Sequence, residues 1–197
     1  MIKITLRELL KCTEEQIKLV REIRNQESVR KSMYTDHHIC LDEHLKWVGS
    51  LKNDKQTIVF VVFVDDFVSG VVSLTAIDRF HLKSDWAFYL DEAVRGGLGA
   101  VLEYRFLDFV FRDLELEKLN CEVIETNEGV RKLHGKFGFV EEGFRREQVI
   151  KNQQRVGVHF LGLTRSDWNI ERQSIYKRYL KVMNKFDLEI EYDSGLN

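Results

Sequence analysis

The chain contains no proline and only three cysteines among its 197 residues. Without proline, its turns must depend on glycine, asparagine, aspartate and serine. Cys12, Cys40 and Cys121 are odd in number and widely spaced, which argues against a disulfide framework or a structural zinc site. The longest apolar run, Ile58–Val64, is too short to span a membrane, and the charged stretch 1–10 is unlike a signal peptide. We therefore expect a soluble cytoplasmic protein.

An excess of charge of either sign is also missing. The chain has 30 Lys and Arg against 32 Asp and Glu, a formal net charge of −2. Nothing in this balance favours nucleic acid or an anionic membrane as a partner. A hydrophobic share of 44% beside 31% charged residues is typical of a folded globular chain. The length fits one domain, or one domain with an appendage.

The hydrophobic period switches repeatedly between two and 3.6 residues, which predicts an α+β fold of strands and helices within one domain. Ile2, Ile4 and Leu6 alternate as a first strand. Thr13 and Gln16 have the spacing of a capping box that opens a helix. A second helix is predicted to begin at a capping Asp42, with a buried stripe of Leu41, Leu45 and Val48 and an opposite face of His44, Trp47 and Leu51.

Three strands are predicted to follow as an antiparallel meander. Asp65-Asp66 separates the β-branched runs Thr57–Val64 and Phe67–Ile77, and Leu82–Leu90 is the third strand. Gly70 predicts a bulge or a close backbone approach. Beyond a glycine-rich helix, a strand over Leu119–Val123, a helix capped by Asn127 and ended by Gly138, and strands over Phe139–Phe144 and Val156–Leu163 complete the predicted domain.

Residues 166–197 have a different character from the domain predicted over residues 1–165. Ser166 or Asp167 is predicted to cap an amphipathic helix, and apolar residues alternate with acidic ones from Phe186 to Tyr192. This tail is predicted to pack against the domain or against a partner in a homodimer. A lid over the functional site is a further interpretation that the sequence leaves open.

The glycine-rich junction Arg95–Ala100 lies where a strand meets a helix. Glycines there let backbone N–H groups face outward, and the helix N-terminus adds partial positive charge, so the junction suits a phosphate or pyrophosphate. A plain tight connection is the alternative. No Lys-Ser/Thr pair follows the glycines, which excludes a P-loop, and the preceding meander argues against a dinucleotide-binding βαβ unit.

A second motif, Asn127-Glu-Gly-Val-Arg-Lys-Leu-His134-Gly-Lys-Phe-Gly-Phe139, follows downstream. With both motifs in this order, the chain resembles the GNAT superfamily of N-acetyltransferases over residues 2–165. In that superfamily three antiparallel strands precede an R/Q-x-x-G-x-G/A loop, a helix, a strand and then N-x-x-A-x-x-L-Y-x-x-x-G-F. The resemblance implies a mixed, mostly antiparallel sheet flanked by helices, with the C-terminal helical tail added. Two positions depart from the pattern: Val94 replaces the loop's Arg or Gln, and His134 replaces Tyr.

The resemblance implies that acetyl-CoA is the acetyl donor and that no metal takes part. Its pyrophosphate would bind the loop, and its pantetheine would follow the strand before the loop, which in this superfamily splays from its neighbour. A backbone N–H near Leu90 would polarise the thioester carbonyl. The implied cofactor-binding residues are Phe88, Tyr89, Leu90, Arg95, Gly96, Gly97, Leu98, Gly99, Ala100 and Asn127.

Two catalytic roles also follow from the resemblance. His134 would protonate the departing thiolate, because imidazole keeps an acid form accessible near neutral pH. A buried core histidine on an apolar stripe is the alternative. Asp85 would remove the proton of the acceptor amine through water, with Glu122 and Glu125 as competing carboxylates. Cys121 has a core-facing pattern and is not expected to be a nucleophile.

The acceptor is expected to bind the N-terminal helices. The segment from Ile23 to Trp47 is similar to the acetyltransferases of pseudaminic acid biosynthesis, which implies acetylation of the 4-amine of UDP-4-amino-4,6-dideoxy-N-acetyl-β-L-altrosamine. Arginines suit a diphosphate, and Met or Trp suits a sugar or base face. The predicted substrate-binding residues are Arg24, Asn25, Arg30, Met33, His44 and Trp47. The alternative is that the arginines are helix-surface charges.

Other functions stay open at this point. Acetylation of a polyamine or of a protein N-terminus suits a closely similar fold, although a polyamine favours a strongly acidic cleft. A non-catalytic acetyl-CoA-binding module would explain the altered loop and the missing tyrosine. His37-His38 does not predict a metal site, because adjacent side chains point apart and no third ligand is suitably spaced.

Overall fold

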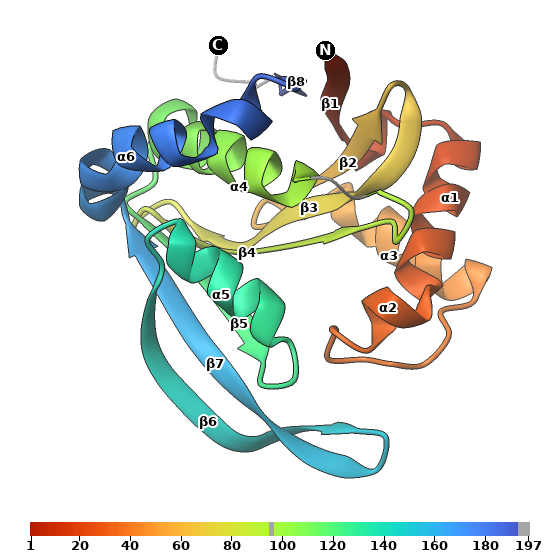
Figure 1. Ribbon diagram of the computed structural model, residues 1–197. Helices are drawn as coiled ribbons and strands as arrows, with labels where there is room; N and C mark the ends of the chain where they lie inside the picture. The colour runs from red at the N-terminus through yellow and green to blue at the C-terminus, as the bar shows by residue number, and fades with distance from the viewer. Residues whose placement is uncertain (95–96, 193–197) are drawn as a thin grey trace.

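In the computed structural model, residues 1–94 and 97–192 are described. They form one eight-stranded mixed sheet with helices on both faces (Figure 1). The strands are β1 (Ile2–Glu8), β2 (Ile58–Val64), β3 (Phe67–Asp78), β4 (Lys83–Leu90), β5 (Lys118–Ile124), β6 (Val140–Lys151), β7 (Gln154–Thr164) and β8 (Phe186–Glu191). The helices are α1 (Glu14–Asn25), α2 (Glu27–Arg30), α3 (Leu41–Leu51), α4 (Leu98–Asp108), α5 (Glu128–Lys136) and α6 (Arg165–Met183), with the short turns η1 (Leu9–Lys11) and η2 (Phe109–Asp113).

The strands lie in the order β6-β7-β5-β4-β3-β2-β1-β8. Neighbouring strands are antiparallel except for the pairs β4–β5 and β1–β8, which are parallel. A mostly antiparallel meander therefore precedes one parallel step at the middle of the sheet. This arrangement confirms the fold class that the sequence predicts.

Local sequence signals explain the first half of the chain. Thr13 Oγ1 accepts from the Gln16 backbone N–H, and the Gln16 side chain accepts from the Thr13 N–H, so the predicted capping box is present. Asp65 and Asp66 both have positive φ, 46° and 69°, as a two-residue hairpin turn requires. The register of β2 and β3 shifts beside Gly70, which confirms the predicted bulge.

Helix α3 differs from its prediction. Cys40 is the N-cap residue, Asp42 lies in the first turn, and the buried side chains are His44, Val48 and Leu51. Leu45, predicted to be buried, is 42% exposed. The predicted stripe was wrong because a hydrogen bond between the buried His44 Nε2 and the Ile17 carbonyl oxygen, 3.0 Å, turns this polar side chain toward α1.

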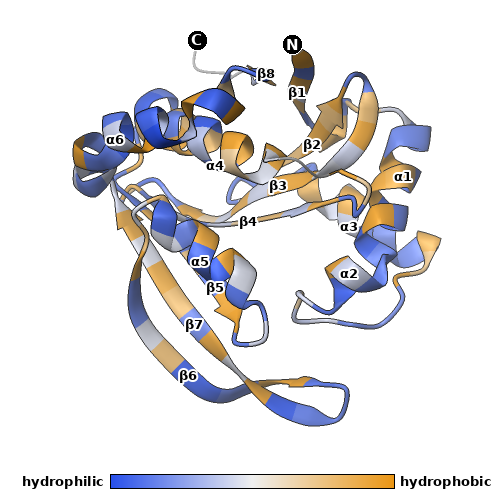
Figure 2. Cartoon of the chain, viewed as in Figure 1, coloured by the Kyte–Doolittle hydropathy of each residue, from blue (hydrophilic) through white to orange (hydrophobic). Residues whose placement is uncertain are grey.

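Two hydrophobic clusters lie on the two faces of the sheet. One joins α1 and α3 to outward-facing residues of β2 and β3. The larger one joins α4 and α6 to the opposite side of the central strands and includes the fully buried Phe106 and Trp168. Figure 2 shows the hydrophobic residues concentrated on the central strands, with the outer face of α6 largely hydrophilic. The rigid sheet centre thus lies between two layers of helix.

The tail beyond residue 165 adds a helix to the α4 layer and a strand to the sheet. Helix α6 packs against α4, and β8 extends the sheet by pairing with β1 from Ile2↔Phe186 to Arg7↔Glu191. The N-cap of α6 is Thr164, whose hydroxyl accepts from the Asp167 N–H. The predicted caps, Ser166 and Asp167, were therefore wrong. Thr164 ends β7 directly, so strand and helix join without a linker. Among the described residues, no helix is long and apolar enough to cross a membrane.

Candidate active site

The sheet opens between its two central parallel strands. β4 and β5 pair only at Lys83↔Lys118, Ser84↔Leu119 and Asp85↔Asn120, although β4 continues to Leu90 and β5 to Ile124. The other edge of β4 stays paired with β3 as far as Gly70↔Leu90. The backbone of β4 beyond Asp85 therefore faces a cleft, which is the splay that the resemblance implies.

A cavity of about 360 Å³ fills this cleft. Its walls come from β4, β5, α5 and the segment after α1. Phe88, Tyr89, Leu90 and Asn127, all predicted to bind the cofactor, line it together with His134. An extended chain lying along the open edge of β4 would meet unpaired backbone N–H and C=O groups, as the pantetheine arm of acetyl-CoA requires.

The described part of the glycine junction, Gly97–Ala100, forms the start of α4, and a Cβ added to Gly99 would lie 4.0 Å from the ring of Phe88, which lines the cleft. Gly97 is the N-cap with φ 98°, a conformation that favours glycine, and Leu98, Gly99 and Ala100 form the first turn. Leu98 is 1% exposed, so its side chain belongs to the core and only its backbone can serve a ligand. The first N–H groups of a helix suit an anion where they lack an intrahelical acceptor; here the Ala100 N–H already donates to the Gly97 carbonyl oxygen at 3.1 Å, so the N–H groups of Leu98 and Gly99 are the candidates. Arg95 and Gly96 lie outside the described residues.

Asn127 stands at the N-cap position of α5 and lines the cleft. Its side chain makes no capping hydrogen bond, which leaves its amide able to contact a bound molecule. Gly138 follows α5 with φ 93°, which confirms the predicted left-handed end of that helix. Asn127 therefore stays a predicted acetyl-CoA contact beside the open edge of β4.

His134 is buried in the wall of the cleft, 3% exposed. Its Nδ1 lies 2.8 Å from Oε1 of Glu103, a fully buried residue of α4. Burial works to lower the pKa of His134, but the charge of Glu103 and the hydrogen bonds that the ring donates to Cys121 and Glu103 outweigh this and raise that pKa above its usual value. Burial also raises the pKa of Glu103. Both shifts favour the retention of a dissociable proton by the pair.

Two of the three predicted carboxylates differ in their access to the cleft. Asp85 lies at the last paired position of β4, where its Oδ1 accepts from Asn120 Nδ2 at 3.0 Å. Glu122 lies on β5, two residues after Asn120. It is exposed, lines the cleft and accepts a hydrogen bond from the Tyr34 hydroxyl. Access therefore favours Glu122, while the role of Asp85 stays a prediction.

Three of the predicted acceptor-binding residues meet in a neighbouring cavity of about 350 Å³, lined by Arg24, His44 and Trp47. Tyr89 lines both this cavity and the cleft. Arg24 Nη2 donates to the Thr35 carbonyl and hydroxyl, at 3.1 Å each, while its buried Nη1 has no hydrogen-bond partner among the described residues. Burial lowers the pKa of His44, so this ring is neutral at neutral pH. The cavity thus combines one cation with an aromatic wall.

The other three predicted residues act mainly on the loop after α2. Asn25 closes that loop through two hydrogen bonds with Ile39, at 2.8 and 2.9 Å. Arg30 donates to the carbonyl oxygens of Asn25, 2.9 Å, and Asp36, 2.7 Å. Arg30 faces a third cavity of about 520 Å³, whereas Met33 lines the cleft. The structure therefore does not bring Arg30 together with Arg24 around one phosphate.

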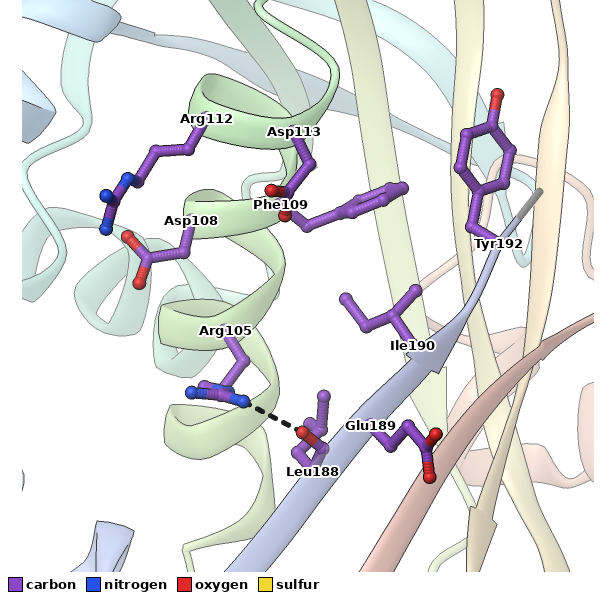
Figure 3. Close-up of a pocket in the computed structure, with 9 residues that line it drawn as sticks. All are labelled: Arg105, Asp108, Phe109, Arg112, Asp113, Leu188, Glu189, Ile190 and Tyr192. Atoms are coloured by element: carbon purple, nitrogen blue, oxygen red, sulfur yellow. Dashed lines mark hydrogen bonds between the residues drawn. The ribbon is translucent and has the colours of Figure 1, made fainter. Parts of the chain in front are cut away.

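A larger cavity, about 740 Å³, lies elsewhere, between α4, η2 and β8 (Figure 3). It is lined by charged side chains of alternating sign, among them Arg105, which donates to the Leu188 carbonyl at 2.9 Å. None of the predicted site residues lines it. Among the residues that the structure describes, no group of three or more His, Cys, Asp or Glu side chains gathers as metal ligands would.

Sequence reasoning missed two residues of this region. Glu103 is a carboxylate in a helix that is buried on almost every side, and such a charge needs a partner. A lone acidic residue within the apolar sequence of α4 was therefore the signal from which a buried, paired Glu103 could have been predicted. Lys151, at the end of β6, donates to the carbonyl oxygens of Arg30, 3.0 Å, and Met33, 2.6 Å, and so ties the β6–β7 hairpin to the loop. No local pattern marks this long-range contact.

Comparisons with known proteins agree with this geometry. The family described as acetyltransferase (GNAT) domain matches residues 3–140. Acetyltransferase PseH of Campylobacter jejuni is 27% identical over 131 residues, 66% of this chain and 81% of that protein. Spermidine N(1)-acetyltransferase of Escherichia coli is 25% identical over 130 residues, 66% of this chain and 70% of that protein.

A solved structure shares the fold. Spermidine N-acetyltransferase from Vibrio cholerae, in complex with CoA and spermine, has a TM-score of 0.78 at 23% identity, covering 84% of this chain and 98% of that one.

Proposed function

The chain belongs to the GNAT family of acetyltransferases, and from that premise we propose that it transfers acetyl from acetyl-CoA to the 4-amino group of a UDP-4-amino-4,6-dideoxy sugar. Acetyl-CoA lies between α4 and α5, with its pyrophosphate at Gly97–Ala100 and its pantetheine along Phe88–Leu90. The acceptor approaches from the side of α1 and α3. The likeness to PseH over most of that protein supports this acceptor class.

One observation carries the proposal: Tyr89 borders both the cleft and the Arg24 cavity. A molecule with a reactive amine at one end and an anionic, aromatic group at the other would span the two spaces. Its amine would lie in the cleft, and its uridine diphosphate would lie against Arg24 and Trp47. Burial raises the pKa of Tyr89, so its hydroxyl stays protonated and can donate to such a ligand.

The reaction is direct transfer. The neutral amine attacks the thioester carbonyl carbon, the C–N bond forms and the C–S bond breaks. Backbone N–H groups of the open β4 edge near Leu90 stabilise the developing oxyanion. A carboxylate on the acceptor side takes the proton that the amine loses, directly or through water, with Glu122 better exposed than Asp85. His134 protonates the departing thiolate.

A polyamine acceptor is the second candidate, because spermidine acetyltransferases are among the relatives and the solved structures. Glu122, Asp91 and Glu92 line the cleft and would attract a polycation, and Glu43 lines the Arg24 cavity. Against it stands Arg24, a half-buried cation that lines the neighbouring cavity.

A screen of acceptors tests the proposal. We would measure acetyl-CoA-dependent release of thiol with UDP-4-amino sugars, UDP-sugars without an amine, spermidine, spermine and peptides with free N-termini. Turnover only with the 4-amino sugar nucleotides is expected. Higher kcat/KM with spermidine would replace the sugar by the polyamine. Tight binding of acetyl-CoA without turnover of any amine would identify a binding module and contradict the enzymatic proposal.

A further inference from the structure

We propose that Glu103 is a positioning residue that holds His134 as an imidazolium, so that the pair is the proton source for the departing thiolate. The inference rests on the function proposed above and concerns a residue that neither family motif contains. It begins from one contact: Glu103 Oε1 lies 2.8 Å from His134 Nδ1, with the two residues 0% and 3% exposed.

The surroundings of the pair leave the carboxylate with a single partner. Glu103 Oε2 is buried and makes no hydrogen bond to any described residue. A buried carboxylate is strongly disfavoured unless a cation or a proton compensates its charge. His134 is the group placed to do this, and the contact fixes Nδ1 on Glu103. The other ring nitrogen, Nε2, is then the one left for Cys121 and for a ligand in the cleft, and a departing thiolate would take its proton in place of Cys121.

The titratable groups around the pair come from three elements. From α4 comes Glu103 itself, from β5 the thiol of Cys121, and from α6 the phenol of Tyr179. From β4 and the start of β6 come aromatic rings: Trp86, Phe88 and Phe139 have ring centroids 5.3, 6.0 and 5.2 Å from that of His134. Among the described residues, no other cationic side chain bonds to the carboxylate, and the aromatic rings limit its contact with water. The pair therefore keeps its proton above neutral pH.

The location of the pair gives it a function beyond packing. His134 lines the cleft in which the thioester of acetyl-CoA would lie. In the step concerned, the C–S bond breaks, the sulfur takes the Nε2 proton, and the neutral imidazole stays bound to Glu103. Solvent returns a proton to His134 after CoA leaves. A tyrosine at this position would carry its own proton at neutral pH, whereas a histidine needs Glu103 to keep one.

Nitrogen NMR tests the charge state without any acceptor. The ring nitrogens of labelled histidine would be followed across about pH 5–10 in the wild-type protein and in Glu103→Gln, with His134→Gln identifying the signals. We expect both nitrogens of His134 to be protonated at pH 7 in the wild type. In Glu103→Gln, deprotonation is expected below about pH 6.5. A singly protonated His134 at pH 7 in the wild type would overturn the proposal.

Kinetics test the role in the reaction. Glu103→Gln keeps the side-chain volume, and we expect kcat to fall roughly 100-fold, with KM for acetyl-CoA nearly unchanged and the alkaline limb moved to lower pH. In a His134→Tyr background the same substitution should change kcat by less than about threefold, because the phenol carries its own proton. Equal losses in both backgrounds would show that Glu103 acts only through packing. If no amine is turned over, the proposed function fails and the NMR result alone decides the charge.

Mass spectrometry separates this mechanism from a covalent one. Cys121 is close enough to bond to His134, so a thiol nucleophile with His134 as its base is the rival chemistry. Protein quenched during turnover should carry no acetyl group on Cys121. An acetyl adduct that forms and decays at the catalytic rate would overturn the proposal, because His134 would then remove a proton instead of donating one.

Discussion

Val182 of α6 occupies the space beside Gly97 at the start of α4. A Cβ on Gly97 would lie 2.6 Å from Val182 Cγ1, and the backbone there has φ 98°. The tail helix thus closes over the turn that begins the proposed pyrophosphate site. Stability of the tail and affinity for acetyl-CoA are therefore coupled at one position.

Replacing Gly97 should lower both the stability of the protein and its affinity for acetyl-CoA. Gly97→Ala meets the clash and the unfavourable φ together, and we expect the free energy of unfolding to fall by about 2–4 kcal/mol. Urea denaturation measures this loss, and calorimetry should show weaker binding of acetyl-CoA. Adding Val182→Ala should restore only the steric part.

A matched control is Gly129→Ala in α5, where nothing lies within 4 Å of the added methyl group. That variant should be as stable as the wild type or slightly more so, since alanine favours a helix. Equal destabilisation by the two glycine substitutions would contradict the role assigned to Val182.

The pH dependence of stability should report the Glu103–His134 pair. Burial lowers the pKa of His134, but Glu103 and the hydrogen bonds raise it by more, to about 10. Because the folded-state pKa exceeds the unfolded value of about 6.5, this contribution is fully present below pH 6.5 and is lost as the pH rises toward 10. The stability difference between wild type and Glu103→Gln should therefore shrink from about pH 6.5 to pH 10. A constant difference in urea denaturation would contradict the pairing.

Much of the fold could be predicted because local chemistry determines it. The Thr13–Gln16 capping box, the Asp65-Asp66 turn and Gly138 each use interactions within a few residues, and all three are present. The sequence placed the meander, the helix after the glycines and the following strand in the right order. The prediction of the buried stripe of α3 was wrong because a polar residue, His44, is buried and forms a hydrogen bond with a different helix.

The candidate site was harder to predict because its contacts join distant segments. Arginine is a residue type that suits a phosphate, yet the guanidinium of Arg30 donates to the carbonyl oxygens of Asn25 and Asp36. His134 matched a motif position, but its partner Glu103 lies 31 residues earlier and belongs to no motif. Sequence patterns identify residue types suited to a chemistry, and only the packing of elements decides which of them meet.

The general base can be assigned by comparing two isosteric variants. Glu122→Gln should lower kcat/KM about tenfold or more at a pH below the pKa of the acceptor amine, where removal of its proton limits the rate. Asp85→Asn should have a smaller effect, because Asp85 is bound to Asn120 and does not line the cleft. Steady-state pH profiles of both variants provide the measurement. A larger loss in Asp85→Asn would restore the original prediction for that residue.

The acceptor can be identified from the sign of the effect at Arg24. Arg24→Gln removes the cation whose buried Nη1 has no partner among the described residues. If the cavity holds a diphosphate, KM for a UDP-4-amino sugar should rise about 10–100-fold, the equivalent of one charged hydrogen bond, with KM for acetyl-CoA unchanged. Trp47→Ala should also raise it. Lys46→Ala is the control, since Lys46 is an exposed cation on α3, next to Trp47, and does not line the cavity. With spermidine, loss of the Arg24 cation should lower KM or leave it unchanged, because like charges repel. A fall in KM for spermidine without any change for the sugar nucleotide would therefore favour the polyamine.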